Sequence, residues 1–131
     1  MGDLENDIEL LVCTRCHLDG DSAEVPQRPG AALFSRLVDA GMDSVRVTPV
    51  ECLSNCSRGC TIALRGASRW TYIYGGLKPD TDIATIIEGT RKYRSTPDGV
   101  VPWRERPEHF RKNCIARIPP LAAPAPNQGK I

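Results

Sequence analysis

The chain has 131 residues and a formal net charge of +1, values typical of one domain with a modest hydrophobic core. No apolar stretch approaches the length that spans a membrane, and the apolar run near the acidic N-terminus is too short for a signal peptide. These features predict a cytoplasmic protein without membrane association. In that reducing compartment, grouped cysteines indicate metal binding or redox chemistry rather than a disulfide framework.

The charge is unevenly distributed along the chain. The first 60 residues carry five basic and ten acidic side chains, a net of −5, whereas the remainder carries twelve basic and six acidic side chains, a net of +6. This asymmetry suggests a polarised surface that docks a charged partner. Ordinary solvated charge on an unspecialised surface explains the same counts equally well.

The first half of the chain predicts a β-α-β unit that presents two groups of cysteines. The apolar run Ile8–Val12 predicts a buried strand, and it leads directly to Cys13 and Cys16. The following segment, His17–Gly30, contains two prolines and two glycines, which exclude regular structure. Apolar residues at three- and four-residue spacing then predict a helix at about Ala31–Ala40.

The second half predicts two more strands and a helix after the second cysteine group. The β-branched run Val45–Val50 predicts a strand leading to the second group, which begins at Cys52. Thr61–Leu64 and Trp70–Tyr74 predict an antiparallel hairpin whose second strand ends at a Gly-Gly pair. Start signals and an isoleucine stripe predict a helix from about Asp80 to Tyr93. The expected fold class is therefore α/β, with the order β-α-β-β-β-α of a reduced thioredoxin-like layout.

The remainder predicts an extension and a tail. We expect a metal-binding domain over residues 1–94, a packed extension over 95–117 with one short helix after Pro107, and a flexible Pro/Ala-rich tail over 118–131. Trp103, Phe110 and Ile115 are the expected anchors of the extension. Basic and aromatic residues alternate there, as in nucleic-acid-binding segments. A near-neutral composition and the lack of a known nucleic-acid motif favour a solvated basic face instead.

Five of the six cysteines occur in the two groups, which predicts a site for a metal or a cluster. Cys13 and Cys16 follow one strand, and Cys52, Cys56 and Cys60 follow another. Adjacent strands lie about 5 Å apart, so loops at neighbouring strand ends can bring four thiolates together. Iron–sulfur clusters and zinc both require such a set of thiolates. Cys114 stands alone in the extension and is expected to be an ordinary thiol.

A family resemblance rests on the stretch E-C-L-S-N-C-S-R-G-C-T-I-A-L and on the W-T-Y-I-Y-G-G-L-K-P-D-T-D-I-A-T-I-I-E that follows shortly after it. These motifs resemble the thioredoxin-like [2Fe-2S] ferredoxins and the related small subunit of respiratory NADH dehydrogenase. The chain is also similar, through D-G-V-V-P-W-R-E-R-P-E, to a smaller bacterial family of predicted metal-binding proteins that often accompany cobalamin-biosynthesis genes. That second resemblance covers nearly everything but the tail.

The resemblance implies a ligand set for a [2Fe-2S] cluster. Cys13 matches the first ligand of the ferredoxins, and Cys52 and Cys56 match their C-x-x-x-C pair. Their second ligand lies farther along the first loop, where this chain has no cysteine, so Cys16 is the natural substitute. Cys60 stands where the ferredoxins usually have proline, and it is a less certain fifth ligand. The resemblance also implies a homodimer and a redox partner protein.

Three functions remain open from the sequence. The first is an iron–sulfur protein for electron transfer or a metal-related accessory function, with no bond chemistry of its own. The second is a metal-delivery protein for zinc or cobalt that serves a metal-handling enzyme, because the same thiols suit a borderline-soft metal. The third is a thiol–disulfide oxidoreductase that uses the C-x-x-C of Cys13 and Cys16. This third function is disfavoured, because the loop His17–Gly30 is expected to keep the helix N-terminus away from the cysteine pair.

Overall fold

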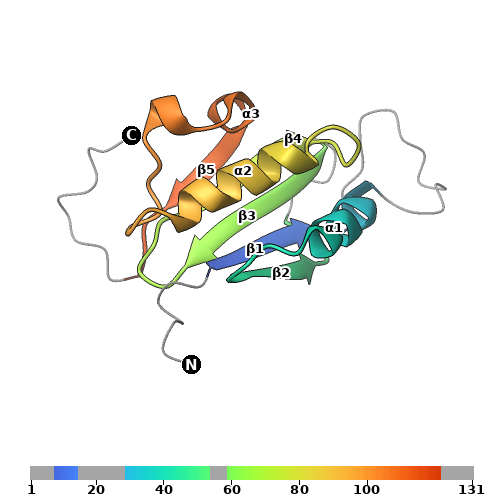
Figure 1. Ribbon diagram of the computed structural model, residues 1–131, viewed down its shortest axis with the longest axis horizontal. Helices are drawn as coiled ribbons and strands as arrows, with labels where there is room; N and C mark the ends of the chain where they lie inside the picture. The colour runs from blue at the N-terminus through green and yellow to red at the C-terminus, as the bar shows by residue number, and fades with distance from the viewer. Residues whose placement is uncertain (1–7, 15–28, 54–58, 122–131) are drawn as a thin grey trace.

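A single five-stranded sheet with helices on one face organises the molecule (Figure 1). The computed structural model describes residues 8–14, 29–53 and 59–121. Their elements, in chain order, are β1 (Ile8–Cys13), α1 (Pro29–Ala40), β2 (Val45–Val50), β3 (Cys60–Gly66), β4 (Thr71–Leu77), α2 (Ile83–Arg94), the 3-10 turn η1 (Trp103–Glu105), α3 (Glu108–Lys112) and β5 (Cys114–Ile118). The expected order β-α-β-β-β-α is confirmed, and η1, α3 and β5 follow it.

The sheet has the strand order β2-β1-β3-β4-β5. β1 runs parallel to β2, and the other neighbouring pairs are antiparallel. Because β1 and β2 are parallel, they end at the same edge of the sheet, and β3 begins at that edge because it is antiparallel to β1. The two strand ends that precede the cysteine groups are therefore adjacent.

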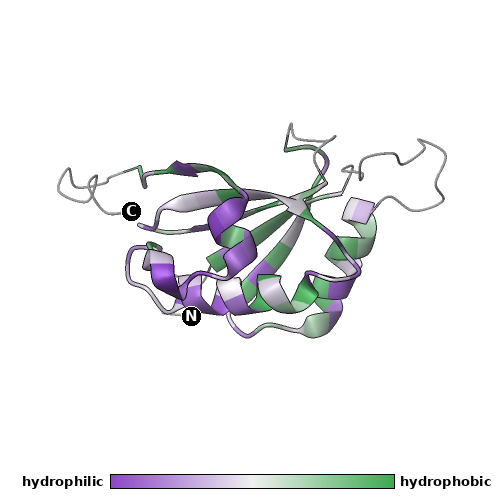
Figure 2. Cartoon of the chain, turned by 90° about the horizontal axis from the view of Figure 1, so that it is seen from above, coloured by the Kyte–Doolittle hydropathy of each residue, from purple (hydrophilic) through white to green (hydrophobic). Residues whose placement is uncertain are grey.

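The hydrophobic core lies between the sheet and the helices. Figure 2, turned by 90°, shows α1 and α2 on the same side of the sheet. Side chains alternate between the two faces of a strand, so Leu10 and Val12 enter this core while Glu9 and Leu11 lie on the opposite face. The core contains side chains from β1, β3, β4 and all three α-helices, among them Leu33, Leu37, Ile62, Leu64, Tyr72, Tyr74, Ile86, Tyr93 and Phe110. No described helix covers the opposite face.

None of the helices in the described part of the chain is long and apolar enough to cross a membrane.

The two longer helices begin at slightly different residues from those predicted from the sequence. α1 begins at Pro29, where the fixed φ of proline suits a first helical position. α2 begins at Ile83 rather than Asp80, because the backbone N–H groups of Thr81 and Asp82 both donate to the carbonyl of Lys78 and form a turn first.

The prediction that β4 ends at the Gly-Gly pair is wrong, because the strand continues to Leu77. Gly76 has a φ of +67° within the strand. A Cβ placed on Gly59 would lie 3.0 Å from the Cα of Gly76, so the two backbones meet with no room for a side chain. Glycine in a strand often serves such a close backbone approach instead of ending the strand.

The extension adds a fifth strand that the sequence analysis missed. β5 pairs with β4, and the short helix expected after Pro107 is present as α3. Phe110 is the anchor as predicted, since it is buried and its ring stacks on Tyr74 with centroids 3.9 Å apart. Trp103 and Ile115 were wrongly predicted as anchors, because they are 47% and 50% exposed. Sequence spacing alone could not show which apolar residues of the extension reach the core.

A first prediction concerns Gly89 on α2, beneath the ring of Phe110. A Cβ at this position would lie 2.1 Å from the Phe110 ring. Gly→Ala inside a helix normally stabilises a protein by about 1 kcal/mol. Here we expect Gly89→Ala to lower the free energy of unfolding by about 1–3 kcal/mol, as overpacking does, when measured by urea denaturation.

The matched control is the double variant Gly89→Ala with Phe110→Leu, which makes room for the new methyl group. It should be no less stable than Phe110→Leu alone. A stability gain in the single variant Gly89→Ala would show that the extension does not dock on α2 in this way.

Candidate metal centre

Cys13 is the last residue of β1 and is fully buried. It lies opposite Val50 in the parallel register, and the next residue, Thr14, donates its backbone N–H to the carbonyl of Val50 at 2.8 Å. The thiol of Cys13 points toward the loop after β2, since its Sγ donates to the carbonyl oxygen of Glu51 over 3.8 Å. This contact places the sulfur beside the residue that precedes Cys52.

Cys52 lies two residues beyond the end of β2 and is exposed. Because β1 and β2 are adjacent and parallel, Cys13 and Cys52 lie at the same end of the sheet. One of these thiols is shielded from solvent and the other is accessible. This arrangement suits a metal or cluster at the surface, held from the protein side and reachable from outside.

The other two thiols of the predicted ligand set, Cys16 and Cys56, lie outside the described residues, as does His17. Within residues 8–14, 29–53 and 59–121, no three histidine, cysteine or acidic side chains form a group that could hold a metal ion. The described residues therefore supply two of the four predicted thiolates. Their chemistry and their position at adjacent strand ends fit the metal or cluster site expected from the sequence.

Cys60, the less certain fifth ligand, has a different environment. It is fully buried and belongs to the hydrophobic core on the helix-covered face. Val12 enters the same core, so Cys13, the next residue on β1, lies on the opposite face of the sheet. A ligand role for Cys60 alongside Cys13 stays a prediction, and it would require the thiol to leave this apolar environment.

Cys114 lies on β5 and is partly buried. Its Sγ donates to the carbonyl of Ala116 over 3.6 Å. Burial raises the pKa of the Cys114 thiol, and the positive charge of Arg106 opposes the increase only in part. A raised pKa leaves less of the reactive thiolate, which makes Cys114 a suitable control for the two cysteine groups.

The N-terminus of α1 packs directly on the end of β1, which corrects an expectation from the sequence. A Cβ placed on Gly30 would lie 2.1 Å from the carbonyl oxygen of Cys13 and 3.1 Å from the carbonyl carbon of Thr14. The start of α1 therefore lies beside Cys13, contrary to the expectation that the segment His17–Gly30 keeps the two apart.

His109, which the sequence analysis did not single out, contacts β4 close to the start of β3. Its Nε2 is 3.0 Å from the carbonyl oxygen of Gly76 and 4.0 Å from a carboxylate oxygen of Asp82. Gly76 in turn contacts Gly59, the first described residue after the segment that contains Cys56. The extension thus supports the start of β3 through backbone contacts, which no sequence motif indicates.

Comparisons with known proteins agree with this architecture. The model of the family described as "Protein of unknown function (DUF1636)" matches residues 10–120. No curated protein matches the chain. Among solved structures, a thioredoxin-like [2Fe-2S] ferredoxin from Aquifex aeolicus superposes with a TM-score of 0.52 at 16% identity, over 85% of this chain and 92% of that chain.

Two further structures of that kind give the same result. The wild-type thioredoxin-like [2Fe-2S] ferredoxin of Aquifex aeolicus has a TM-score of 0.50 at 14% identity, covering 84% of this chain and 97% of its own. A cysteine-to-serine variant has a TM-score of 0.52 at 17% identity, covering 83% and 98%. At these identities the likeness shows the fold, and it confirms the predicted thioredoxin-like ferredoxin layout.

Gly30 provides the test of the contact between α1 and Cys13. We expect Gly30→Ala to push the helix and the strand end apart, because the clash is with backbone atoms that cannot rotate away. The labelling rate of Cys13 by iodoacetamide, followed by peptide mass spectrometry, should then rise several-fold as the buried thiol gains exposure.

The control is Gly41→Ala at the other end of the same helix. Gly41 has a φ of +62°, and no atom lies within 4 Å of the point that a Cβ would occupy there. The variant therefore carries only a local backbone strain of about 1–2 kcal/mol. Equal Cys13 labelling in both variants would contradict the proposed packing of α1 on the strand end.

Proposed function

The chain belongs to the DUF1636 family of unknown function, and we propose that it is an iron–sulfur protein that holds a [2Fe-2S] cluster for electron transfer or a metal-related accessory function. The observation that supports this most directly is the position of Cys13 and Cys52 at the ends of two adjacent parallel strands. Similarity in fold to thioredoxin-like [2Fe-2S] ferredoxins supports it independently.

The proposed ligands are Cys13, Cys16, Cys52 and Cys56, with Cys60 as a less certain fifth thiol. A bound [2Fe-2S] cluster would supply one-electron chemistry. The chain's own contribution is to shield Cys13 from water and to place the N-terminus of α1 beside it. The buried position keeps solvent away from this ligand, and the helix packed on the strand end fixes the backbone that carries it.

The exposed position of Cys52 would give a redox partner protein a route to a bound cluster. The proposed setting is the cytoplasm, where thiols stay reduced. The proposed assembly is a homodimer, by analogy with the ferredoxins. A link to cobalamin biosynthesis follows only from the sequence resemblance to proteins that accompany such genes. In this function the protein would carry electrons and would catalyse no bond change by itself.

Zinc or cobalt bound for delivery to a metal-handling enzyme is the alternative, because the same four thiolates form a tetrahedral site for either metal. The third function, a thiol–disulfide oxidoreductase, regains some support because Gly30 at the start of α1 contacts Cys13, so the helix N-terminus is not held away from that cysteine. That function uses only the first cysteine group and assigns no role to Cys52.

Anaerobic purification followed by visible spectroscopy and analysis of iron, zinc, cobalt and acid-labile sulfide separates these functions. We expect a red-brown protein with about two iron and two sulfide per chain, as a [2Fe-2S] cluster requires. Stoichiometric zinc or cobalt without sulfide would favour metal delivery. A metal-free protein with reactive thiols at Cys13 and Cys16 would favour the oxidoreductase.

Single cysteine variants test the ligand assignment. Cys52→Ala should abolish the visible absorption and release iron, because alanine has no atom that can bind the cluster. Cys114→Ser should leave the absorption and the iron content unchanged, since the Cys114 thiol donates a hydrogen bond to Ala116 on the same strand and its pKa is raised. Visible absorption that survives in Cys52→Ala at full iron content would exclude Cys52 as a required ligand.

Cys60→Ala distinguishes a core residue from a fifth ligand. Cys60 packs in the apolar core, so we expect the variant to keep its absorption spectrum and lose about 1 kcal/mol of stability. Loss of the spectrum in a variant that is still folded by circular dichroism would show that Cys60 binds the cluster.

A further inference from the structure

A row of three charged residues crosses the helix-free face of the sheet at the end opposite Cys13. Glu9 on β1 lies directly opposite Arg46 of β2 and directly opposite Arg65 of β3 in the strand registers. Residues in register on adjacent strands project from the same face. Glu9 is four residues before Cys13, so this row lies about 13 Å from the thiol end at the usual rise per residue.

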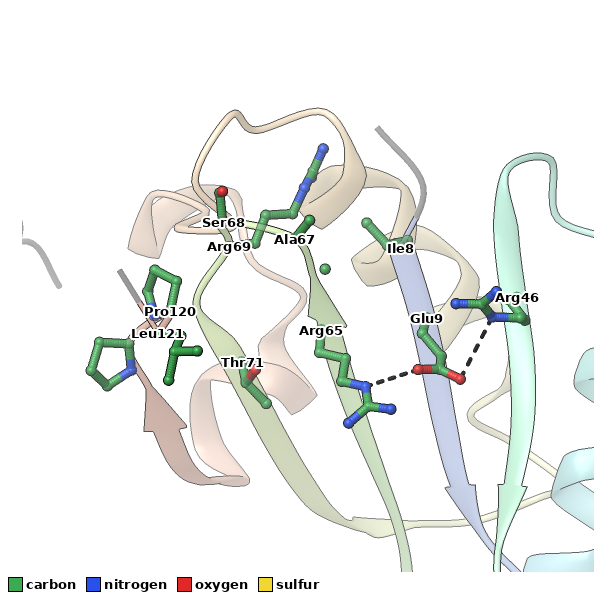
Figure 3. A pocket seen from close by; sticks show the side chains of 12 residues that line it. Ile8, Glu9, Arg46, Arg65, Ala67, Ser68, Arg69, Thr71, Pro120 and Leu121 are labelled. Atoms are coloured by element: carbon green, nitrogen blue, oxygen red, sulfur yellow. Dashed lines mark hydrogen bonds and ion pairs between the residues drawn. The ribbon is translucent and has the colours of Figure 1, made fainter. Parts of the chain in front are cut away.

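The Glu9 carboxylate pairs with the Nε atom of each arginine. The Nε of Arg65 lies 2.8 Å from one carboxylate oxygen, and the Nε of Arg46 lies 3.6 Å from the other. Thr48 also donates to Glu9, at 2.6 Å. Figure 3 shows the carboxylate between the two guanidinium groups. Burial alone would raise the pKa of Glu9, but the hydrogen bonds from Thr48 and Arg65 and the two positive charges outweigh it and lower that pKa.

The arrangement leaves the terminal amino groups of both arginines available. Within the described part of the chain, the Nη atoms of Arg46 and Arg65 make no hydrogen bond or ion pair, and their side chains are 72% and 56% exposed. The Glu9 side chain is only 13% exposed, so its charge lies beneath them. The three residues together carry a net charge of +1, with the positive groups outermost.

These residues line one side of a hollow of about 420 Å³ (Figure 3). The turn between β3 and β4 contributes Ser68, β4 contributes Thr71, and Pro120 and Leu121 form an apolar side. Arg69 also lines the hollow, but its guanidinium donates to the carbonyls of Tyr93 and Arg94, so it is occupied as a structural link. The volume is suitable for a small organic molecule.

We propose that this hollow binds a small phosphate-bearing molecule through the oriented guanidinium groups of Arg46 and Arg65. Arginine binds phosphate through pairs of parallel hydrogen bonds, and a guanidinium that is already oriented loses less entropy on binding. The apolar side formed by Pro120 and Leu121 accommodates the organic part of the ligand. Glu9 acts as a positioning residue for both arginines.

Isothermal titration calorimetry at low ionic strength tests this site, with AMP, inorganic phosphate and adenosine as probes. We expect AMP and phosphate to bind and adenosine not to bind. Arg46→Gln and Arg65→Gln should each weaken AMP binding by about tenfold, the usual effect of one lost charged hydrogen bond. Adenosine binding equal to that of AMP, or no binding of either phosphate probe, would overturn the proposal.

Arg36→Gln is the matched control. Arg36 is an exposed arginine of α1 that pairs with Asp80 on the helix-covered side, and its replacement should leave AMP affinity unchanged. An equal loss of AMP affinity in this variant would show that AMP is attracted by the positive charge of the whole protein, and it would overturn the proposed site. All three variants are at the surface, so circular dichroism should show unchanged folding.

The variant Glu9→Gln distinguishes the orientation of the two arginines from the net charge of the row. This variant makes the row more positive but removes the carboxylate that holds both Nε atoms. We expect weaker AMP binding despite the added positive charge, with the effect present at both low and moderate salt. Tighter binding would show that Glu9 only opposes the ligand and would overturn its positioning role.

Discussion

The placement of β1 between a parallel and an antiparallel neighbour determines where every chemically distinctive residue lies. β2 pairs with it in parallel register and β3 in antiparallel register. The parallel pair brings the ends of β1 and β2 together, and with them Cys13 and Cys52. The same two registers place Arg46 and Arg65 on either side of Glu9 at the other end. One strand thus carries a thiol site at its end and a charged row at its start.

Close backbone contacts at glycines connect the remaining elements to this strand. Gly30 allows α1 to rest on the carbonyl of Cys13, and Gly59 meets Gly76 where β3 begins. Gly89 lets the ring of Phe110 lie against α2. A Cβ at Gly30, Gly59 or Gly89 would lie 3.0 Å or less from a neighbouring atom, so helix, strand and extension pack at close separations. Rigid support of this kind is what a metal site needs, because its ligands must keep their geometry when the charge of the metal changes.

Hydrophobic periodicity and turn residues predicted the first six elements and their order correctly, because those signals are local to each segment. The strand over residues 45–50 was predicted with the bounds that the structure shows, and the core side of α1 follows from its apolar spacing. β5 was missed because its five residues, C-I-A-R-I, are too few and too mixed to differ from a loop. Glycine at position 76 was misread as the end of a strand, since its role depends on a backbone far away in sequence.

The sequence by itself determined the local elements, the two cysteine groups and the resemblance to ferredoxins, because each depends on residues close together in the chain. Only the tertiary structure decided that Cys13 lies beside Glu51 while Cys60 enters the core, since strand alternation and register set the face of each thiol. The charged row likewise exists only through strand pairing, because Arg46 and Arg65 lie 37 and 56 positions after Glu9 along the chain. Hydrogen bonding between strands, a non-local interaction, creates both arrangements.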